Sequence, residues 1–177
     1  MPLVLGAQTA VSSLRGCNMR PKPFRPEALH DDARYVRDRE TGLIWHRCCE
    51  RTLYADTDRS SVIYHANYLR YFEFGRASLM RDAGYPYREI EDMGYVYPII
   101  DLAIQFHEPL YYDDPMFIHT RTAELERVKL RFDYVISHSE TGKIICNGFT
   151  RHCALNSSGK PVAVDPRTVQ LWKDFPV

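Results

Sequence analysis

Hydrophobic and polar positions along the chain repeat in two ways, one with the period of a helix and one with the period of a strand. The helical pattern is a stripe of apolar or small residues formed by Tyr68, Phe72, Gly75, Leu79 and Ala83. Its spacings of three and four predict a helix over about residues 66–83 with one buried face, ended by Gly84. A glycine within this stripe either lets a large element pack closely or is merely tolerated, and the pattern leaves both interpretations open.

The segments around this helix are typical of strands. One precedes the helix, and four follow it after a short helical turn that ends near Met93; these strands are expected at about residues 43–54, 96–106, 116–126, 130–139 and 143–155. The turn at residues 140–142 is short enough for a hairpin, and Asp165 with Pro166 begins a final helix that runs to about Lys173. This order predicts an α+β fold in which one long helix packs on a mostly antiparallel sheet.

Residues 1 to about 40 differ in character from the rest. Pro21, Pro23 and Pro26 interrupt any helix or central strand there, within a stretch that mixes serine, glycine and charge. We therefore expect residues 1–40 to be a poorly ordered or loosely packed extension, with a short helical piece at about residues 27–37. The compact domain is expected to span residues 41–177.

Composition narrows the class of protein. The 177 residues suffice for one domain, and 23 basic residues balance 23 acidic ones, so the whole molecule has no net attraction to nucleic acid. No apolar run is long enough for a membrane span, and the N-terminus lacks the features of an export signal. The five cysteines form no CxxC pair, which favours reduced thiols and a cytoplasmic location. The histidines at 107, 119, 138 and 152 lie on different predicted strands, so no metal site is expected.

The residues from Tyr54 to Tyr68 carry a recognisable motif, Tyr-Ala-Asp-Thr-Asp-Arg-Ser-Ser-Val-Ile-Tyr-His-Ala-Asn-Tyr. This motif resembles the signature of hotdog-fold acyl-CoA thioesterases of the 4-hydroxybenzoyl-CoA thioesterase and YbgC type. That signature is Asp-x-Asp, two or three small residues, an apolar pair, an aromatic residue, and then His or Asn before a helix. The element order also matches, as does the turn at residues 108–114, so the resemblance covers roughly residues 45–155. It implies a hotdog fold, a long central helix wrapped by an antiparallel sheet, and thioester hydrolysis without a cofactor.

The resemblance assigns the acting carboxylate to Asp58, either as nucleophile or as general base. The start of the helix near His65 offers unpaired backbone amides for the oxyanion, and such a donor typically lowers a barrier by about 3–4 kcal/mol. The ring of His65 is either a general base or dispensable, and both interpretations stay open. Tyr64 is expected at the catalytic site as part of the pocket wall, and Asp56 as a residue that binds the loop. From the residues alone, an Asp-x-Asp before serines is more often a simple turn.

Residues that bind the substrate are predicted in two groups. Ser61, Tyr68 and Phe72 are expected around the acyl group, with Tyr97 as a further candidate, although the family often has glycine where Ser61 stands. Arg127, Lys129 and Arg131 alternate along a predicted strand and either contact the phosphates of coenzyme A or form a solvated face.

One further carboxylate and the predicted partners complete these expectations. Glu73 on the helix is interpreted as an ion-pair partner of Arg70 or Arg76. The resemblance implies an acyl-CoA substrate and a homodimer or homotetramer, because the family's active site lies at a dimer interface. Two alternatives remain: a thioesterase that acts on acyl carrier protein, and a non-catalytic protein that binds acyl thioesters. The acyl chain length and the preference for aromatic or aliphatic groups cannot be predicted.

Overall fold

The computed structural model describes residues 21–29 and 32–174. Its strands are β1 (Pro26–Leu29), β2 (Asp32–Asp38), β3 (Ile44–Arg51), β4 (Tyr95–Val96), β5 (Ile99–Phe106), β6 (Pro115–Leu125), β7 (Lys129–His138), β8 (Ile144–Cys153) and β9 (Leu155–Asn156). Its helices are the 3-10 turns η2 (Tyr54–Asp56) and η3 (His65–Asn67), followed by α1 (Tyr68–Asp82), α2 (Tyr87–Asp92) and α3 (Pro166–Asp174).

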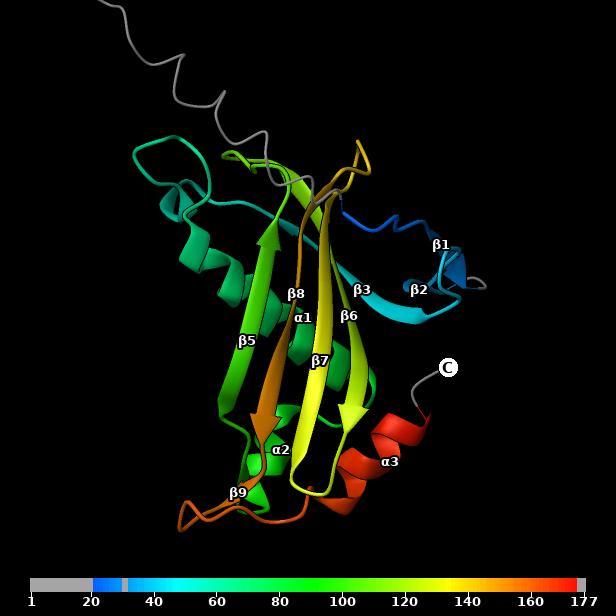
Figure 1. The fold of residues 1–177 in the computed structure, drawn as a ribbon, viewed down its shortest axis with the longest axis vertical. Coiled ribbons are helices and arrows are strands. Elements are labelled where there is room, and N and C mark those ends of the chain that lie inside the picture. Colours follow the sequence, from blue (N-terminus) through cyan, green and yellow to red (C-terminus); the bar gives the residue numbers. More distant parts are fainter. Residues whose placement is uncertain (1–20, 30–31, 175–177) are drawn as a thin grey trace, which may run out of the picture.

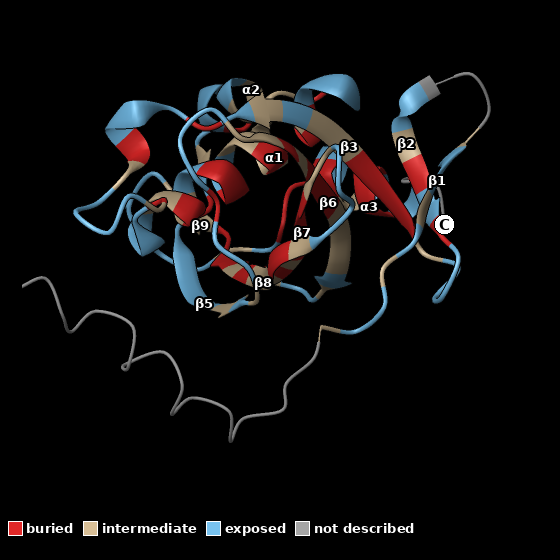
Figure 2. Ribbon diagram, turned by 90° about the horizontal axis from the view of Figure 1, so that it is seen from above, coloured by how far each residue is buried: buried red, intermediate tan, exposed pale blue. Residues whose placement is uncertain are grey.

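A seven-stranded sheet forms the body of the protein, in the order β1-β2-β3-β6-β7-β8-β5. Every neighbouring pair in it is antiparallel. The sheet curves around α1, which lies against its concave face (Figures 1 and 2). The predicted α+β architecture, a long central helix wrapped by an antiparallel sheet, is therefore confirmed.

Helix α1 presses its predicted stripe against the sheet. Its buried residues include Tyr68, Phe72, Gly75 and Leu79, whereas Ala83 follows the helix and is exposed. A Cβ atom at Gly75 would overlap the Thr120 hydroxyl of β6 and would lie 2.7 Å from Ile118 Cγ2. Glycine at position 75 thus allows the sheet to approach the helix closely, which answers the question that the sequence left open.

The described part of the N-terminal segment forms strands, so the short helix predicted at residues 27–37 is wrong. Strand β2 pairs with β3, and its residues 36–38 are buried, exposed and buried in turn. Fully buried Val36 packs with Trp45 and Val135 on the outer face of the sheet. This apolar contact favours the period of a strand over that of a helix. The poorly ordered or loosely packed extension predicted at residues 1–40 stays a prediction, and its first 20 residues lie outside the described residues.

The edge strand β5 is the most apolar exposed element of the described chain. Leu102, Ile104 and Phe106 pair with residues of β8 that face the helix, so all three point to the concave side. The large hydrophobic side chains that are exposed lie on β5, next to its two ends and in the 53–64 segment: Leu53, Tyr54, Tyr64, Met93, Val96, Ile99, Ile100, Leu102, Phe106, Tyr111 and Tyr112. Within the described part of the chain, no helix is long and apolar enough to cross a membrane.

Candidate active site

Asp58 begins a tight turn between two short extended segments that are bridged at Thr57 and Ile63. The Asp58 N–H donates to Val62 O at 2.9 Å, and the Ser61 N–H donates back to Asp58 O at 3.0 Å. The Asp58 carboxylate accepts a 2.6 Å hydrogen bond from the Ser60 N–H, which fixes one oxygen of an otherwise exposed side chain. Aspartate favours this first turn position because its side chain bonds the backbone two residues ahead. The turn therefore also supplies a purely structural reason for Asp58.

Ser61 has a backbone φ of 63°, in the left-handed region. A residue with a side chain is disfavoured there by about 1–2 kcal/mol relative to the right-handed region, whereas glycine is not. A glycine at position 61 would adopt this backbone without that cost. The turn nevertheless closes with serine at position 61. The Ser61 N–H donates to Asp58 O, and the Asp58 N–H donates to Val62 O.

Asp56 connects the Asp58 turn to α1. Its carboxylate is buried and accepts hydrogen bonds from the Leu53 N–H at 3.1 Å, Arg70 Nη1 at 2.7 Å and the Tyr71 hydroxyl at 2.8 Å. Its backbone carbonyl accepts hydrogen bonds from the Tyr64 N–H and from Asn67 Nδ2, both at 2.9 Å. The prediction that Asp56 binds the loop is confirmed by these contacts.

The start of the helical segment provides free donors close in sequence to Asp58. Among the described residues, none accepts a hydrogen bond from the backbone N–H of His65 or of Ala66, and both residues are exposed. They precede α1, whose positive dipole end favours negative charge at this point. The rings of Tyr64 and His65 lie 4.3 Å apart, and Tyr64 is 43% exposed. The carboxylate, the amide donors and the aromatic wall thus come from one stretch of nine residues, 58–66.

The two aromatic residues predicted around the acyl group are more deeply placed. Tyr68 is 3% exposed, and its ring contacts Phe106 of β5 with ring centres 5.1 Å apart. Phe72 is 1% exposed and stacks on Tyr134 at 4.2 Å. Tyr68 therefore reaches the exposed edge of the sheet through Phe106, whereas Phe72 is a core residue with almost no surface in this chain. Tyr97 is likewise buried, and its hydroxyl donates to Asp165.

The predicted phosphate-binding residues lie far from Asp58 within one chain. Lys129 begins β7, and Arg127 lies in the turn before it. Val62 of the Asp58 turn pairs with Tyr111, just before β6 begins. The 11 residues of β6, a length of about 36 Å, separate that end of the sheet from the turn to β7.

Arg131 differs from the other two basic residues because its guanidinium is already bound by acidic side chains. Its Nη1 lies 2.9 Å from Glu124, its Nε lies 2.7 Å from Asp133, and its plane covers the Phe149 ring at 4.2 Å. Arg127 has an exposed side chain, and Lys129 is half-buried. Of the three, Arg127 and Lys129 are better suited to meet a phosphate.

Sequence reasoning missed the roles of Arg70 and Tyr71. The prediction that Glu73 pairs with Arg70 or Arg76 is wrong: Arg70 binds Asp56, and Arg76 packs over the Tyr87 ring at 5.2 Å. Glu73 points to solvent and has no ion pair among the described residues. A buried carboxylate loses more than an exposed glutamate does when no cation pairs with it, which favours the Arg70–Asp56 pair.

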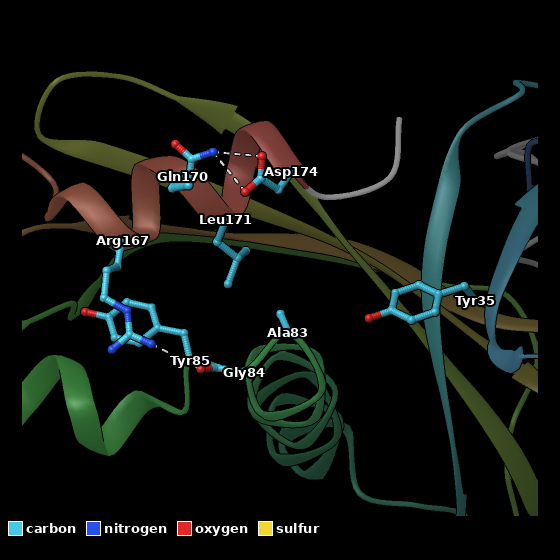
Figure 3. A pocket seen from close by; sticks show the side chains of 8 residues that line it. All are labelled: Tyr35, Ala83, Gly84, Tyr85, Arg167, Gln170, Leu171 and Asp174. Atoms are coloured by element: carbon cyan, nitrogen blue, oxygen red, sulfur yellow. Dashed lines mark hydrogen bonds between the residues drawn. The ribbon is translucent and has the colours of Figure 1, made fainter.

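A cavity of about 310 Å³ lies at the other end of α1, and it contains none of the predicted site residues. Tyr35, Ala83 and Leu171 are among its walls, and Arg167 lies beside Tyr85 at one side (Figure 3). The 15 residues of α1, about 22 Å, separate this cavity from the helix start. The described residues contain no group of three or more potential metal ligands.

Comparison with known proteins places the chain in a family. Residues 53–172 match the model of the thioesterase-like superfamily. A putative acyl-CoA thioesterase from Bacillus subtilis, YneP, is 33% identical over 70% of this chain and 84% of its own length. A putative esterase from Aquifex aeolicus is 31% identical over 70% of this chain and 94% of its own length. The chain belongs to the thioesterase-like superfamily.

Solved structures agree with this assignment. A probable thioesterase from Bartonella henselae is 28% identical, covers 68% of this chain and 99% of that chain, and superimposes with a TM-score of 0.63. The predicted hotdog fold and the predicted class of thioester hydrolase are confirmed.

Proposed function

We propose that this protein hydrolyses acyl-CoA thioesters and that the Asp58 carboxylate is the acting group. The observation that carries this proposal is the pairing of an exposed, oriented carboxylate with the acceptor-free amides of His65 and Ala66. A thioester carbonyl needs both, one group to deliver the attacking oxygen and one to stabilise the oxyanion. Membership of the thioesterase-like superfamily supports the same chemistry.

The reaction has two possible courses at this site. In one, the Asp58 carboxylate attacks the carbonyl carbon, the C–S bond breaks, and water then hydrolyses the acyl-enzyme anhydride. In the other, Asp58 takes a proton from water as the water oxygen attacks the same carbon. In both, the His65 and Ala66 amides stabilise the oxyanion, and coenzyme A leaves as a thiolate that takes up a proton. The products are a free acid and coenzyme A.

A second copy of the chain fits the exposed edge strand β5. Leu102 and Phe106 are 40% and 49% exposed, and an unpaired apolar edge strand is prone to pair with another chain. Further exposed hydrophobic residues lie next to both ends of β5, including Val96 before it and Tyr111 after it. Antiparallel pairing of two β5 strands around a two-fold axis brings the start of one strand beside the end of the other, so these clusters would cover each other. We infer a homodimer.

The same dimer would complete the substrate site. The starts of β5 and β7 lie at one end of the sheet, because Ile99 and Leu130 both pair with His152 of β8. The Asp58 turn lies at the opposite end. In the two-fold pair, the partner subunit's Lys129 therefore lies at the same end as Asp58, where it can meet the phosphates of coenzyme A. Within one chain Lys129 and Asp58 lie too far apart to share a substrate, but in the proposed dimer Lys129 of one subunit and Asp58 of the other could do so.

Release of free thiol from a panel of aliphatic and aromatic acyl-CoA thioesters tests the proposed reaction. Turnover by the purified protein is the expected result. Binding of a thioester without turnover would instead identify a sensor, and hydrolysis restricted to acyl carrier protein thioesters would identify the other alternative.

A further inference from the structure

We propose that Arg70 and Tyr71 are positioning residues: through Asp56, they hold the Asp58 carboxylate and the His65 amides at a fixed separation. This inference rests on the proposed function of Asp58. Both residues lie on α1, and the hydrogen bonds that they donate go to Asp56. Arg70 and Tyr71 each donate one hydrogen bond to the Asp56 carboxylate, at 2.7 and 2.8 Å, one to each oxygen.

Asp56 makes contacts on the sides of both catalytic elements, in addition to the bridge between Thr57 and Ile63. Towards α1, its backbone carbonyl accepts the Tyr64 N–H, which lies directly before His65. Towards Asp58, it lies two residues before the turn, at the end of η2, where its carboxylate also accepts the Leu53 N–H. Because Asp56 is 1% exposed, water cannot readily replace a donor that is lost.

A shift of Asp56 would therefore move the attacking oxygen relative to the oxyanion donors. Misplacement of reacting groups by about 1 Å can cost on the order of 100-fold in rate. Both elements act on the transition state, whereas substrate affinity depends mainly on contacts elsewhere. Loss of the positioning contacts should lower kcat and leave KM nearly unchanged.

The chain offers a matched control for this effect. The Tyr85 hydroxyl donates a 3.0 Å hydrogen bond to Asp165, a buried carboxylate near the cavity at the far end of α1. Tyr71 and Tyr85 are both buried, and each binds a buried aspartate. Replacing either tyrosine with phenylalanine removes one hydroxyl from the same kind of contact. Only Tyr71→Phe should affect the position of Asp58.

The experiment measures kcat, KM and the free energy of unfolding for Tyr71→Phe and Tyr85→Phe, and for Arg70→Met and Arg70→Lys. For Tyr71→Phe, we expect kcat to fall by about tenfold or more with KM within about twofold of wild type. Tyr85→Phe should lose about as much stability as Tyr71→Phe but keep the wild-type kcat. Arg70→Lys should recover part of the kcat lost in Arg70→Met, because lysine keeps the charge that faces Asp56.

Amide hydrogen exchange gives a second measurement that does not depend on activity. In Tyr71→Phe, the amides of Ser61 and Tyr64 should exchange faster, and in Tyr85→Phe they should not. Equal kcat and equal exchange in the two variants would overturn the positioning role. A wild-type protein without thioesterase activity, but with faster exchange in Tyr71→Phe only, would overturn the proposed reaction and keep the anchoring of the turn.

Discussion

The backbone N–H of Ser60 lies 2.6 Å from Oδ1 of Asp58 and donates a hydrogen bond to it. One oxygen of the carboxylate is thus held by its own turn, and the other remains available. Asparagine can accept the same hydrogen bond with its Oδ1 atom but supplies neither a nucleophile nor a base. The contact therefore separates the structural role of Asp58 from its chemical role.

The left-handed backbone of Ser61 predicts that Ser61→Gly stabilises the protein. The native φ of 63° is unfavourable for serine but not for glycine. Relief of this backbone strain should raise the free energy of unfolding by about 1 kcal/mol. The greater entropy of glycine in the unfolded chain offsets part of this gain. Urea unfolding measures the change. Ser60→Gly is the control, because residue 60 has no positive φ and should gain nothing. A Ser61→Gly variant less stable than Ser60→Gly would contradict this account of the turn.

Two buried histidines predict a loss of stability in acid. Burial lowers the pKa of His119 to about 3 and that of His152 to about 4, below the value near 6.5 expected in the unfolded chain. Above pH 6.5 both states are neutral at these positions. As the pH falls from about 6.5 to about 4, the unfolded state binds protons that the folded state does not, and the free energy of unfolding decreases by up to about 1.4 kcal/mol per pH unit for each histidine.

Urea unfolding at a series of pH values tests this prediction. In His119→Gln, the free energy of unfolding should decrease less between pH 6.5 and pH 4 than it does in wild type. The difference is the part that protonation of His119 in the unfolded state contributes. Parallel curves for the two proteins would show that His119 does not contribute.

The exposed edge strand predicts a homodimer that a single charge on β5 disrupts. Leu102 points to the concave side of the edge, and a lysine there would place a charge in the interface. Sedimentation at micromolar concentration should give a dimer for wild type and a monomer for Leu102→Lys. Ser158→Lys, in an exposed turn at the end of β9, should remain dimeric. A monomeric wild-type protein would contradict the proposed assembly.

The proposed phosphate contact predicts a change in KM for one class of substrate. Lys129→Ala should raise KM for an acyl-CoA several-fold and leave KM unchanged for the same acyl group on pantetheine, which lacks the nucleotide phosphates. Lys173→Ala, which changes an exposed lysine in the last turn of α3, is the control. Equal effects of Lys129→Ala on both substrates would exclude a phosphate contact by this residue.

Local patterns predicted the elements well, because their causes lie within a few residues. The stripe of α1 was readable from its spacing, and Asp56 was assigned to the loop because aspartates in polar turns bind nearby amides. The Asp56–Arg70 pair joins residues 14 apart and depends on where the helix begins, so no local pattern indicates it.

Sequence-based prediction failed where contacts between residues distant in the sequence determine the local structure. A short helix was predicted at residues 27–37, but Val36 finds an apolar partner in Trp45, and this contact stabilises the strand β2. Phe72 at the acyl group stays a prediction: in this chain its side chain is 1% exposed and stacks on Tyr134. The cytoplasmic location, the dimer and the roles of the site residues stay predictions.

The most direct test of the central claim compares wild type with Asp58→Asn in the hydrolysis of acyl-CoA thioesters, with free thiol as the product measured. Asparagine keeps the hydrogen bond to Ser60, so circular dichroism and urea unfolding should match wild type. The account predicts that kcat falls by about two orders of magnitude or more in the variant. A folded Asp58→Asn protein that retains the wild-type kcat would show that Asp58 only shapes the turn and that another group performs the reaction.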